Sequence, residues 1–323
     1  MTTNWNLRLF FGLALAVAAT AAEPMKKIEV HGHRGARAMR PENTLPAFEY
    51  AIGIGVDVLE LDMAVTKDNV VVVSHDPILR APVCSPPPSA KARMAVIHQL
   101  TLAQVREWDC GNVRNPDFRT QQPVPGTKMP TLDEVFQLAA KSRVKFNIET
   151  KITPERTTRA QAEARLVQLG LKPGTPEGEN AVESMMAIGP DSAPSPEEFV
   201  KLVLEKIRKY HVEDRVILQS FDYRTLIAMK KIAPEIQLSA LSTDPNRSFV
   251  DIAKEAGAQI ISPVYVSVTP EKVAAAHKAG LIVVPWTANK PADWDKLIAA
   301  GVDAIISDDP ASLIAYLSKN GAR

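Results

Sequence analysis

Beyond the first two dozen residues, short runs of β-branched and apolar residues alternate with longer segments whose apolar residues recur every three or four positions. The short runs predict strands, and the longer segments predict helices. We expect eight strands, at 27–31, 57–63, 144–149, 215–219, 236–241, 259–262, 281–286 and 303–307. We expect eight helices after them, at 44–53, 131–141, 196–210, 222–232, 248–256, 270–279, 291–300 and 310–319.

Helix start and stop signals support this alternation. Thr131 is followed three residues later by Glu134, a spacing typical of a helix N-terminus. Gly257, Gly280 and Gly301 stand where helices should end. Eight successive strand–helix units predict one α/β domain of the (β/α)8 TIM-barrel class. A doubly wound open sheet is the weaker alternative, because no glycine-rich phosphate turn opens the first helix.

Two segments interrupt the rhythm. Residues 77–130 carry the proline-rich stretches CSPPPS, RNPDF and QQPVPGT, which predict an irregular insertion over one barrel face, after the second strand unit. Residues 152–195 begin with a charged, helix-like piece at 155–169 and continue as a Gly/Pro/Ser-rich stretch, which predicts a loop. The valine run 70–73 follows a turn and predicts the return arm of a hairpin.

The N-terminus predicts export. Arg8 precedes an apolar run that ends near Ala19, and an Ala-x-Ala site at 19–21 predicts cleavage near Ala21 or Ala22. The run is too short to span a bilayer, so we expect a signal peptide over 1–22 and a mature domain over 23–323. An uncleaved anchor or a buried helix is the alternative. We therefore expect a secreted or periplasmic protein with no stable membrane insertion.

Composition narrows the partners and the redox state. Hydrophobic residues make up 46% of the chain and charged residues 23%, as in ordinary globular proteins. A net charge of +1 gives no reason to expect a nucleic acid as partner. In an exported protein the two cysteines, Cys84 and Cys110, are a disulfide candidate. Two free thiols remain the alternative, because sequence does not show whether the β-carbons meet.

Carboxylates collect where barrel chemistry occurs, at the carboxyl ends of strands. Alternation along the second strand turns Glu60 and Asp62 into the barrel, and Glu149 ends the third strand. Three carboxylates in one barrel mouth repel one another unless a cation joins them. An all-oxygen set suits Ca²⁺ or Mg²⁺ better than zinc, so we expect one such ion here. The alternative is a structural ion network with Arg34 and Lys151.

Two histidines end apolar runs beside these carboxylates, His33 and His75, and they are the candidate acid/base pair. The pattern His-x-His, with His31 before His33, also opens zinc-dependent amidohydrolases. That chemistry needs ligand histidines on later strands, and none of the six histidines ends the strands at 236–241 or 259–262. The amidohydrolase reading therefore fails. We expect His31 to be a hydrogen-bonded core histidine, with a tuning role behind the site as the alternative.

A series of short motifs is spaced along the chain. The motifs are His-Arg-Gly at 33–35, Pro-Glu-Asn-Thr at 41–44, Glu-Leu-Asp at 60–62, His-Asp at 75–76, Glu-Thr-Lys at 149–151, Gln-Ser-Phe at 219–221, Trp-Thr-Ala-Asn at 286–289 and Ser-Asp-Asp-Pro at 307–310. Together they resemble the glycerophosphodiester phosphodiesterase family over roughly residues 28–317. The stretch QQPVPGTKMPTLDEVF looks like that of the longer, exported members. His31 departs from the family pattern, where an aliphatic residue is expected.

This resemblance implies a metal-dependent (β/α)8 barrel that hydrolyses glycerophosphodiesters to glycerol 3-phosphate and an alcohol. Carried over by motif, the three carboxylates hold the cation, His33 and His75 transfer protons, and Arg34 holds the phosphate. The implied partner is a small-molecule glycerophosphodiester, and the oligomeric state stays unknown.

Three further residues are assigned to substrate binding. Glu42 is expected to bind the metal or glycerol, with charge stabilisation of the helix that starts at 44 as the alternative. Lys151 is expected to contact phosphate, unless it is a plain surface lysine. Trp286 is expected to pack against the glycerol or the headgroup; as a core tryptophan it would need a partner for its N–H.

Two other functions stay open. A lysophospholipase D, or a phosphatidylinositol-type phospholipase on the same barrel, would need an apolar rim, whereas residues 77–130 are polar and proline-rich. A non-catalytic exported protein that only binds glycerophosphodiesters would not need both histidines and all three carboxylates.

Overall fold

The computed structural model describes residue 1 and residues 27–90, 93–168 and 172–323. The expected signal peptide falls almost entirely on residues 2–26, which lie outside the described residues, so it stays a prediction. Within the described ranges, no helix is both long enough and apolar enough to cross a membrane.

Eight parallel strands form the barrel predicted from the sequence. Neighbours pair in chain order, and β1 pairs with β11. Backbone hydrogen bonds close the ring between the last two strands, from Asp303 N–H to the Val283 carbonyl and from Ile306 N–H to the Pro285 carbonyl, each 3.0 Å. The strands are β1 (Glu29–Gly32), β2 (Val58–Val65), β6 (Lys145–Thr150), β7 (Val216–Ser220), β8 (Gln237–Ser242), β9 (Ile260–Pro263), β10 (Ile282–Val283) and β11 (Ala304–Ser307).

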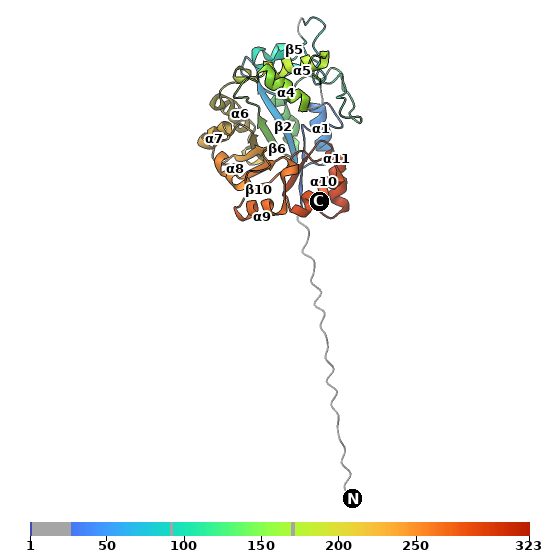
Figure 1. Ribbon diagram of the computed structural model, residues 1–323, viewed down its shortest axis with the longest axis vertical. Helices are drawn as coiled ribbons and strands as arrows, with labels where there is room; N and C mark the ends of the chain where they lie inside the picture. The colour runs from blue at the N-terminus through green and yellow to red at the C-terminus, as the bar shows by residue number, and fades with distance from the viewer. Residues whose placement is uncertain (2–26, 91–92, 169–171) are drawn as a thin grey trace.

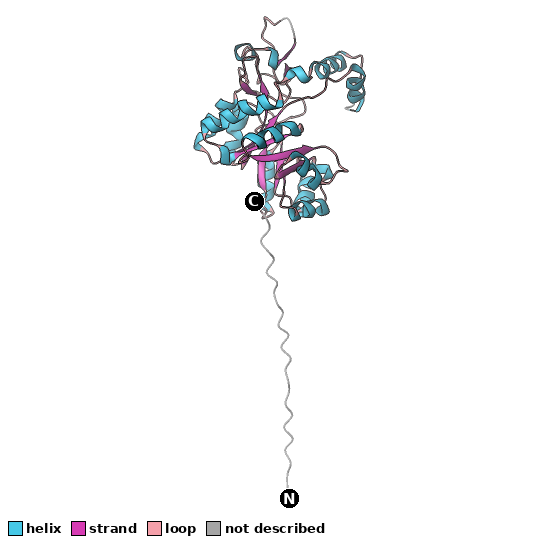
Figure 2. Ribbon diagram, turned by 90° about the vertical axis from the view of Figure 1, so that its left-hand side faces the viewer, coloured by secondary structure: helices cyan, strands magenta, loops and turns pink. Residues whose placement is uncertain are grey.

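Helices cover the outside of the strands (Figure 2). Thr131 and Ser195 form the capping boxes that open two of them, and Gly257 and Gly301 end two others in the left-handed conformation. The outer helices are α1 (Leu45–Ile54), α3 (Leu132–Leu138), α6 (Pro196–Tyr210), α7 (Tyr223–Ile232), α8 (Phe249–Ala256), α9 (Pro270–Lys278), α10 (Pro291–Ala300) and α11 (Pro310–Lys319).

The core has an outer and an inner layer. Leu59 and Leu61 of β2 belong to the large cluster between strands and helices, as the alternation along β2 predicts. A smaller apolar cluster that includes Ile217, Ile260 and Ile306 fills the barrel interior. The polar residues of β2 therefore lie next to an apolar layer of the barrel interior.

The hairpin arm predicted at 70–73 is confirmed. β3 (Val71–Val73) pairs antiparallel with β2, with Val73 opposite Met63. This pairing turns the chain back over the barrel rim and places His75 just beyond the end of β3.

The insertion after β3 is more regular than predicted. Cys84 and Cys110 form a disulfide, and with Trp108 and other apolar side chains they build a small second core against β2 and β3. The prolines were misleading because residues 89–115 contain none. β5 (Met94–Val96), a short 3-10 helix (Ile97–Gln99) and α2 (Leu102–Val105) form in this proline-free stretch, and β5 pairs with β4 (Ile78–Arg80), which precedes Pro82 and the CSPPPS stretch.

The segment between β6 and α6 also differs from the prediction. α4 (Arg159–Gln168) falls where a helix-like piece is expected, but α5 (Pro176–Ala187) occupies the expected loop. Thr175 caps α5 and Pro176 starts it, a signal that the Gly/Pro/Ser composition obscured. Figure 1 shows β5, α4 and α5 at one end of the barrel, away from the C-terminus.

Candidate active site

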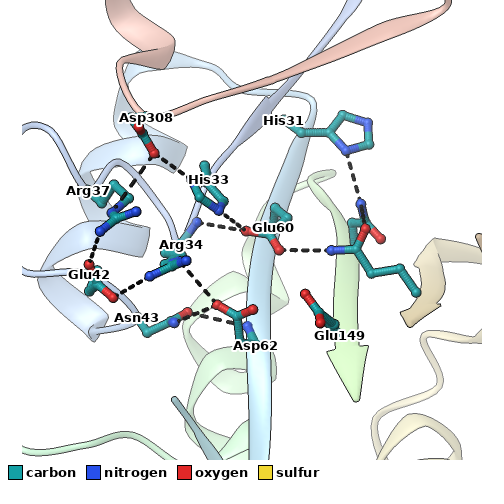
Figure 3. A network of polar contacts seen from close by, with 12 residues as sticks. His31, His33, Arg34, Arg37, Glu42, Asn43, Glu60, Asp62, Glu149 and Asp308 are labelled. Atoms are coloured by element: carbon teal, nitrogen blue, oxygen red, sulfur yellow. Dashed lines mark hydrogen bonds and ion pairs between the residues drawn. The ribbon is translucent and has the colours of Figure 1, made fainter. Parts of the chain in front are cut away.

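Three carboxylates meet at the carboxyl ends of β2 and β6. The parallel pairing of these strands sets Asp62 directly opposite Glu149, and Glu60 lies one inward position earlier on β2. All three side chains are buried, and one oxygen of each lies within 4.8 Å of the others (Figure 3). The structure thus brings together the set that the sequence predicts as cation ligands.

Neutral N–H donors hold Glu60. Its Oε2 accepts a hydrogen bond from the Arg34 backbone N–H at 2.9 Å, and its Oε1 accepts one from Gln219 Nε2 at 2.8 Å. Burial, followed by the charge of Asp62, raises the pKa of Glu60 well above its usual value.

Asp62 is held by cationic groups and an amide. Asn43 Nδ2 donates to Asp62 Oδ2 at 2.9 Å, and Lys151 Nζ lies 3.3 Å from Asp62 Oδ1. Arg34 Nε lies 3.4 Å from Asp62 Oδ2. Burial alone would raise the pKa of Asp62, but the nearby positive charges, Lys151 first, hold it well below its usual value. Asp62 is therefore the firmly ionised member of the set.

Glu149 shares Lys151 with Asp62. Lys151 Nζ donates to Glu149 Oε1 at 2.8 Å. Burial raises the pKa of Glu149 to about 7 although Lys151 opposes the shift. Without a further positive charge the three carboxylates cannot all ionise easily at neutral pH. The all-oxygen donor set and this excess of buried negative charge fit a hard divalent cation.

Two glycines explain why His33 and Arg34 occupy the tip of β1. A Cβ on Gly32 would lie 2.1 Å from the carbonyl oxygen of Gly35. Gly35 has a φ of +84° and lies against the backbone of Ala47. Only glycine fits this tight turn, which ends the strand and turns the two functional side chains toward the mouth.

His33 is oriented by a carboxylate on the adjacent strand end. His33 Nδ1 donates to Asp308 Oδ1 at 2.5 Å, because an ionised carboxylate can only accept. His33 Nε2 lies 3.9 Å from Glu60 Oε2. Burial lowers the pKa of His33, whereas Asp308 opposes the shift. Despite its burial, Asp308 has a pKa lowered to about 2, chiefly by the charge of His33.

Asn289 fixes Asp308 in turn. Its Nδ2 donates to Asp308 Oδ2 at 2.6 Å, and its Oδ1 accepts the Asp308 backbone N–H at 2.9 Å. His33, Asp308 and Asn289 therefore form a continuous chain in which each side chain orients the next.

Arg34 and Glu42 form a second charged group beside the carboxylates. Arg34 NH1 donates to Glu42 Oε1 at 2.6 Å, and Arg37 NH2 lies 2.7 Å from Glu42 Oε2. The charges of Arg34 and Arg37 lower the pKa of the buried Glu42 against the effect of its burial. Glu42 thus binds two arginines here, and Arg34 presents a fixed positive charge next to Asp62.

His75 approaches from the loop after β3. Its Nδ1 donates to Asp76 Oδ1 at 2.8 Å, and its side chain is 36% exposed. Burial, followed by the charge of Lys151, lowers the pKa of His75. His75 and Glu42 line one small cavity, whose other wall includes the disulfide. The insertion therefore forms one side of the site.

Trp286 lies on the loop after β10. Its Nε1 donates to the Ser262 carbonyl at 2.9 Å, so the partner that a core tryptophan requires is present. Its ring meets Phe221 edge-to-face with centroids 5.5 Å apart. Phe221 is 44% exposed and follows Gln219 by two residues, so an aromatic pair stands on the rim beyond β7 and β10.

The sequence profile of the glycerophosphoryl diester phosphodiesterase family matches residues 33–173 and 175–312. The chain belongs to this family. A glycerophosphodiester phosphodiesterase of Caldanaerobacter subterraneus is 30% identical over 295 residues, covering 91% of this chain and all of the relative. The predicted enzyme class, a phosphoric diester hydrolase acting on glycerophosphodiesters, is confirmed.

Solved structures support the same fold. A Silicibacter pomeroyi protein assigned to this enzyme class is 29% identical with a TM-score of 0.75, covering 92% of this chain and 95% of the other. An Oleispira antarctica phosphodiesterase, solved with the product sn-glycerol-3-phosphate, is 20% identical with a TM-score of 0.67, covering 90% of this chain and 96% of the other.

A shorter stretch is similar to another enzyme in sequence. The rat lysophospholipase D GDPD1 is 54% identical over 127 residues, only 36% of this chain and 35% of that protein.

Several residues that contact or support the predicted site residues were not assigned from the sequence, among them Arg37, Asn43, Asp76, Gln219, Phe221, Asn289 and Asp308. Asp308, Gln219 and Phe221 lie in the motifs quoted for the resemblance, so the sequence offered a signal for them. Their roles depend on partners far along the chain: Asp308 is 275 residues from His33, and Gln219 is 159 residues from Glu60.

Proposed function

We propose that the chain hydrolyses glycerophosphodiesters with one divalent cation, Ca²⁺ or Mg²⁺, bound by Glu60, Asp62 and Glu149. The observation that carries the proposal is the buried group of three carboxylate oxygens within 4.8 Å of one another. When bound, the cation supplies stabilisation of the negative charge that develops on a non-bridging phosphate oxygen.

Arg34 and Lys151 are the proposed phosphate contacts. Arg34 is held rigidly by Glu42 and stands beside Asp62, so its charge is available at the same edge of the site. Lys151 bridges Asp62 and Glu149. Because the phosphodiester carries a negative charge, we expect the positive charges of Arg34 and Lys151 to attract it to the site. In this proposal Glu42 acts by holding Arg34, and the rim residue Trp286 packs against the glycerol or the headgroup.

His33 and His75 are the proposed acid/base pair. Each histidine is hydrogen-bonded through Nδ1 to a carboxylate, so each has Nε2 free to exchange a proton with the substrate. One imidazole removes the proton from the hydroxyl group whose oxygen attacks phosphorus. The other imidazole gives a proton to the alcohol oxygen as its bond to phosphorus breaks. The pKa of both histidines is lowered, chiefly by burial, which favours the neutral, base-competent form at neutral pH.

Release of glycerol 3-phosphate from glycerophosphocholine tests the proposal. Chelation with EDTA should abolish release, and Ca²⁺ or Mg²⁺ should restore it. His75→Ala should keep cation binding and lose about 10²- to 10⁴-fold in kcat. His277→Ala is the matched control, since His277 also pairs with a carboxylate, Asp303, but at the other end of the barrel. Full activity after chelation would refute the cation, and tight binding without release would favour the binding protein.

A second substrate class has one observation in its favour. The loops after β6, β7 and β8, together with α7 and α8, line an open hollow of ≈ 680 Å³. Its apolar lining includes Ile152, Phe221, Ile227 and Leu241, and its charged lining consists of Asp222, Arg224, Asp244, Arg247 and Glu255. An acyl chain attached to the glycerol would find apolar contacts there, so lysophospholipids are a second candidate. Comparing kcat/KM for glycerophosphocholine and lysophosphatidylcholine decides between them, because the two substrates share a headgroup.

Export stays part of the proposal. The disulfide Cys84–Cys110 supports it, because disulfides persist in oxidising compartments. N-terminal sequencing of the protein recovered outside the cytoplasm should start near residue 23. A mature protein that retains residues 1–22 would contradict the assignment of an exported, longer member of the family.

A further inference from the structure

A buried chain of polar side chains connects the barrel interior with Glu60. It begins at His31 on β1, passes through Asn147 on β6 and Gln219 on β7, and ends at Glu60 on β2. Figure 3 labels the two ends of this chain, His31 and Glu60. Asn147 Nδ2 lies 3.4 Å from His31 Nδ1 and donates to Gln219 Oε1 at 3.0 Å. Gln219 Nε2 donates to Glu60 Oε1 at 2.8 Å. Each of the four side chains is at most 2% exposed.

The carboxylate end fixes the direction of every hydrogen bond in this chain. With the cation bound, Glu60 is ionised and can only accept, so Gln219 must turn its NH₂ group toward it, as the 2.8 Å contact from Nε2 shows. The carbonyl oxygen of Gln219 then faces Asn147 and needs a donor, so Asn147 must present its own NH₂ group. The second N–H of that group points to His31 Nδ1, which must accept. His31 is therefore neutral, with its proton on Nε2.

Two independent features agree with this direction. Asn147 Oδ1 is buried and has no hydrogen-bond partner among the described residues. If the Asn147 amide were flipped, this oxygen would face the Gln219 oxygen, and two acceptors would repel each other. The observed orientation leaves one acceptor unsatisfied, which is unfavourable, but it directs both N–H groups of Asn147 to acceptors. Burial lowers the pKa of His31 to about 3, so the imidazole stays neutral under ordinary conditions.

We infer that His31, Asn147 and Gln219 are positioning residues that aim the Glu60 carboxylate at the cation site. The Arg34 backbone N–H holds the other oxygen of Glu60, so the two donors together fix the plane of the carboxylate beside Asp62. The inference rests on the proposed function, in which Glu60 is a cation ligand. It gives His31, which departs from the family pattern, a role at a distance from the substrate.

The variants separate positioning from packing. Gln219→Met keeps a side chain of similar length and removes the N–H to Glu60, so cation affinity should fall about 10- to 100-fold. His31→Leu removes only the distant acceptor and should weaken the cation about 3- to 10-fold. His31→Gln should restore affinity to within about twofold, because its amide oxygen can accept from Asn147. Ser239→Ala is the matched control, since Ser239 is buried inside the barrel but bonds to Ser262 instead.

The readout is the dissociation constant of Ca²⁺ and of Mg²⁺, measured by calorimetry on the full chain, with the melting temperature recorded in parallel. Weaker binding in Gln219→Met and His31→Leu, recovery in His31→Gln and no change in Ser239→Ala would support the inference. A lowered melting temperature with an unchanged dissociation constant would overturn it, because that outcome describes packing alone. If the unaltered chain bound neither ion, the proposed cation site itself would be wrong.

Discussion

Replacing Asp308 by asparagine should invert the proton arrangement of His33 without removing a single heavy-atom contact. Asn289 Nδ2 donates to one oxygen of Asp308 at 2.6 Å, so the new amide must keep its oxygen on that side. Its NH₂ group then faces His33 Nδ1, which at present donates to Asp308 at 2.5 Å. The imidazole proton must move to Nε2, so the nitrogen facing the site changes from an acceptor to a donor.

The expected loss follows from two contributions. A hydrogen bond to a charged group contributes about 1.5–3 kcal/mol, so its loss alone lowers kcat about 10- to 150-fold. An inverted tautomer also removes the base, and the corresponding change in a serine-protease triad lowers kcat about 10⁴-fold. We therefore expect the loss of kcat in Asp308→Asn to lie between these two limits. The binding of Ca²⁺ should be nearly unchanged, because Asp308 is not among the three grouped carboxylates.

Stability should also decline, in a pH-dependent way. The pKa of the buried Asp308 is lowered from 3.8 to about 2, so its ionisation stabilises the fold above pH 3.8 and this contribution is lost as pH falls toward 2. The shift corresponds to about 2 kcal/mol at neutral pH, which Asp308→Asn would lose. Assays should therefore be run well below the melting temperature of the variant.

The assay is the pH dependence of glycerol 3-phosphate release. Asp308 raises the pKa of His33 against the effect of burial, so its removal should move the limb that reports His33 to lower pH. Asp309→Asn is the matched control, because Asp309 caps α11 through Ser312. A normal kcat in Asp308→Asn, or a limb displaced to higher pH, would refute the reasoning.

Three shorter predictions concern stability. Burial raises the pKa of Glu149 from 4.5 to about 7, so without divalent cations the free energy of unfolding should fall by about 3 kcal/mol as pH rises from 4.5 to 7. The melting temperature should fall with it, and Ca²⁺ should reverse the fall. A melting temperature that does not change with pH would contradict this prediction. Lys151→Met should lower the free energy of unfolding of the cation-free protein, measured in urea, by about 3–5 kcal/mol. The control Lys145→Met, at the surface, should lower it by less than about 1 kcal/mol. Equal effects of the two substitutions would exclude a buried ion network around Lys151. Replacing Cys84 and Cys110 by alanine should lower the free energy of unfolding by about 3 kcal/mol, and an unchanged urea midpoint would show that the bridge does not stabilise the fold.

Local periodicity explains why so much of the barrel could be predicted. Strand alternation alone placed Glu60 and Asp62 on the inner face, because the side chains of a strand point alternately to its two faces. Register is a different matter. The pairing that sets Asp62 opposite Glu149 depends on how β2 and β6 align, and no local pattern reports it. Composition was misleading at α5, where glycine and proline suggested a loop although Thr175 and Pro176 mark a helix start.

The ion pairs around the three carboxylates connect the proposed cation site with the binding of an anionic substrate. Arg34 divides its charge between Glu42 and Asp62, and Lys151 divides its charge between Asp62 and Glu149. A phosphate that drew Arg34 and Lys151 toward itself would leave the buried carboxylates without enough positive charge, at a high cost in free energy. Glu60 already lacks a direct ion pair with either residue, because its hydrogen bonds come from neutral N–H groups. A divalent ion at the carboxylates would compensate for both deficits, so the proposed phosphate binding and the proposed cation binding would support each other through the same two side chains.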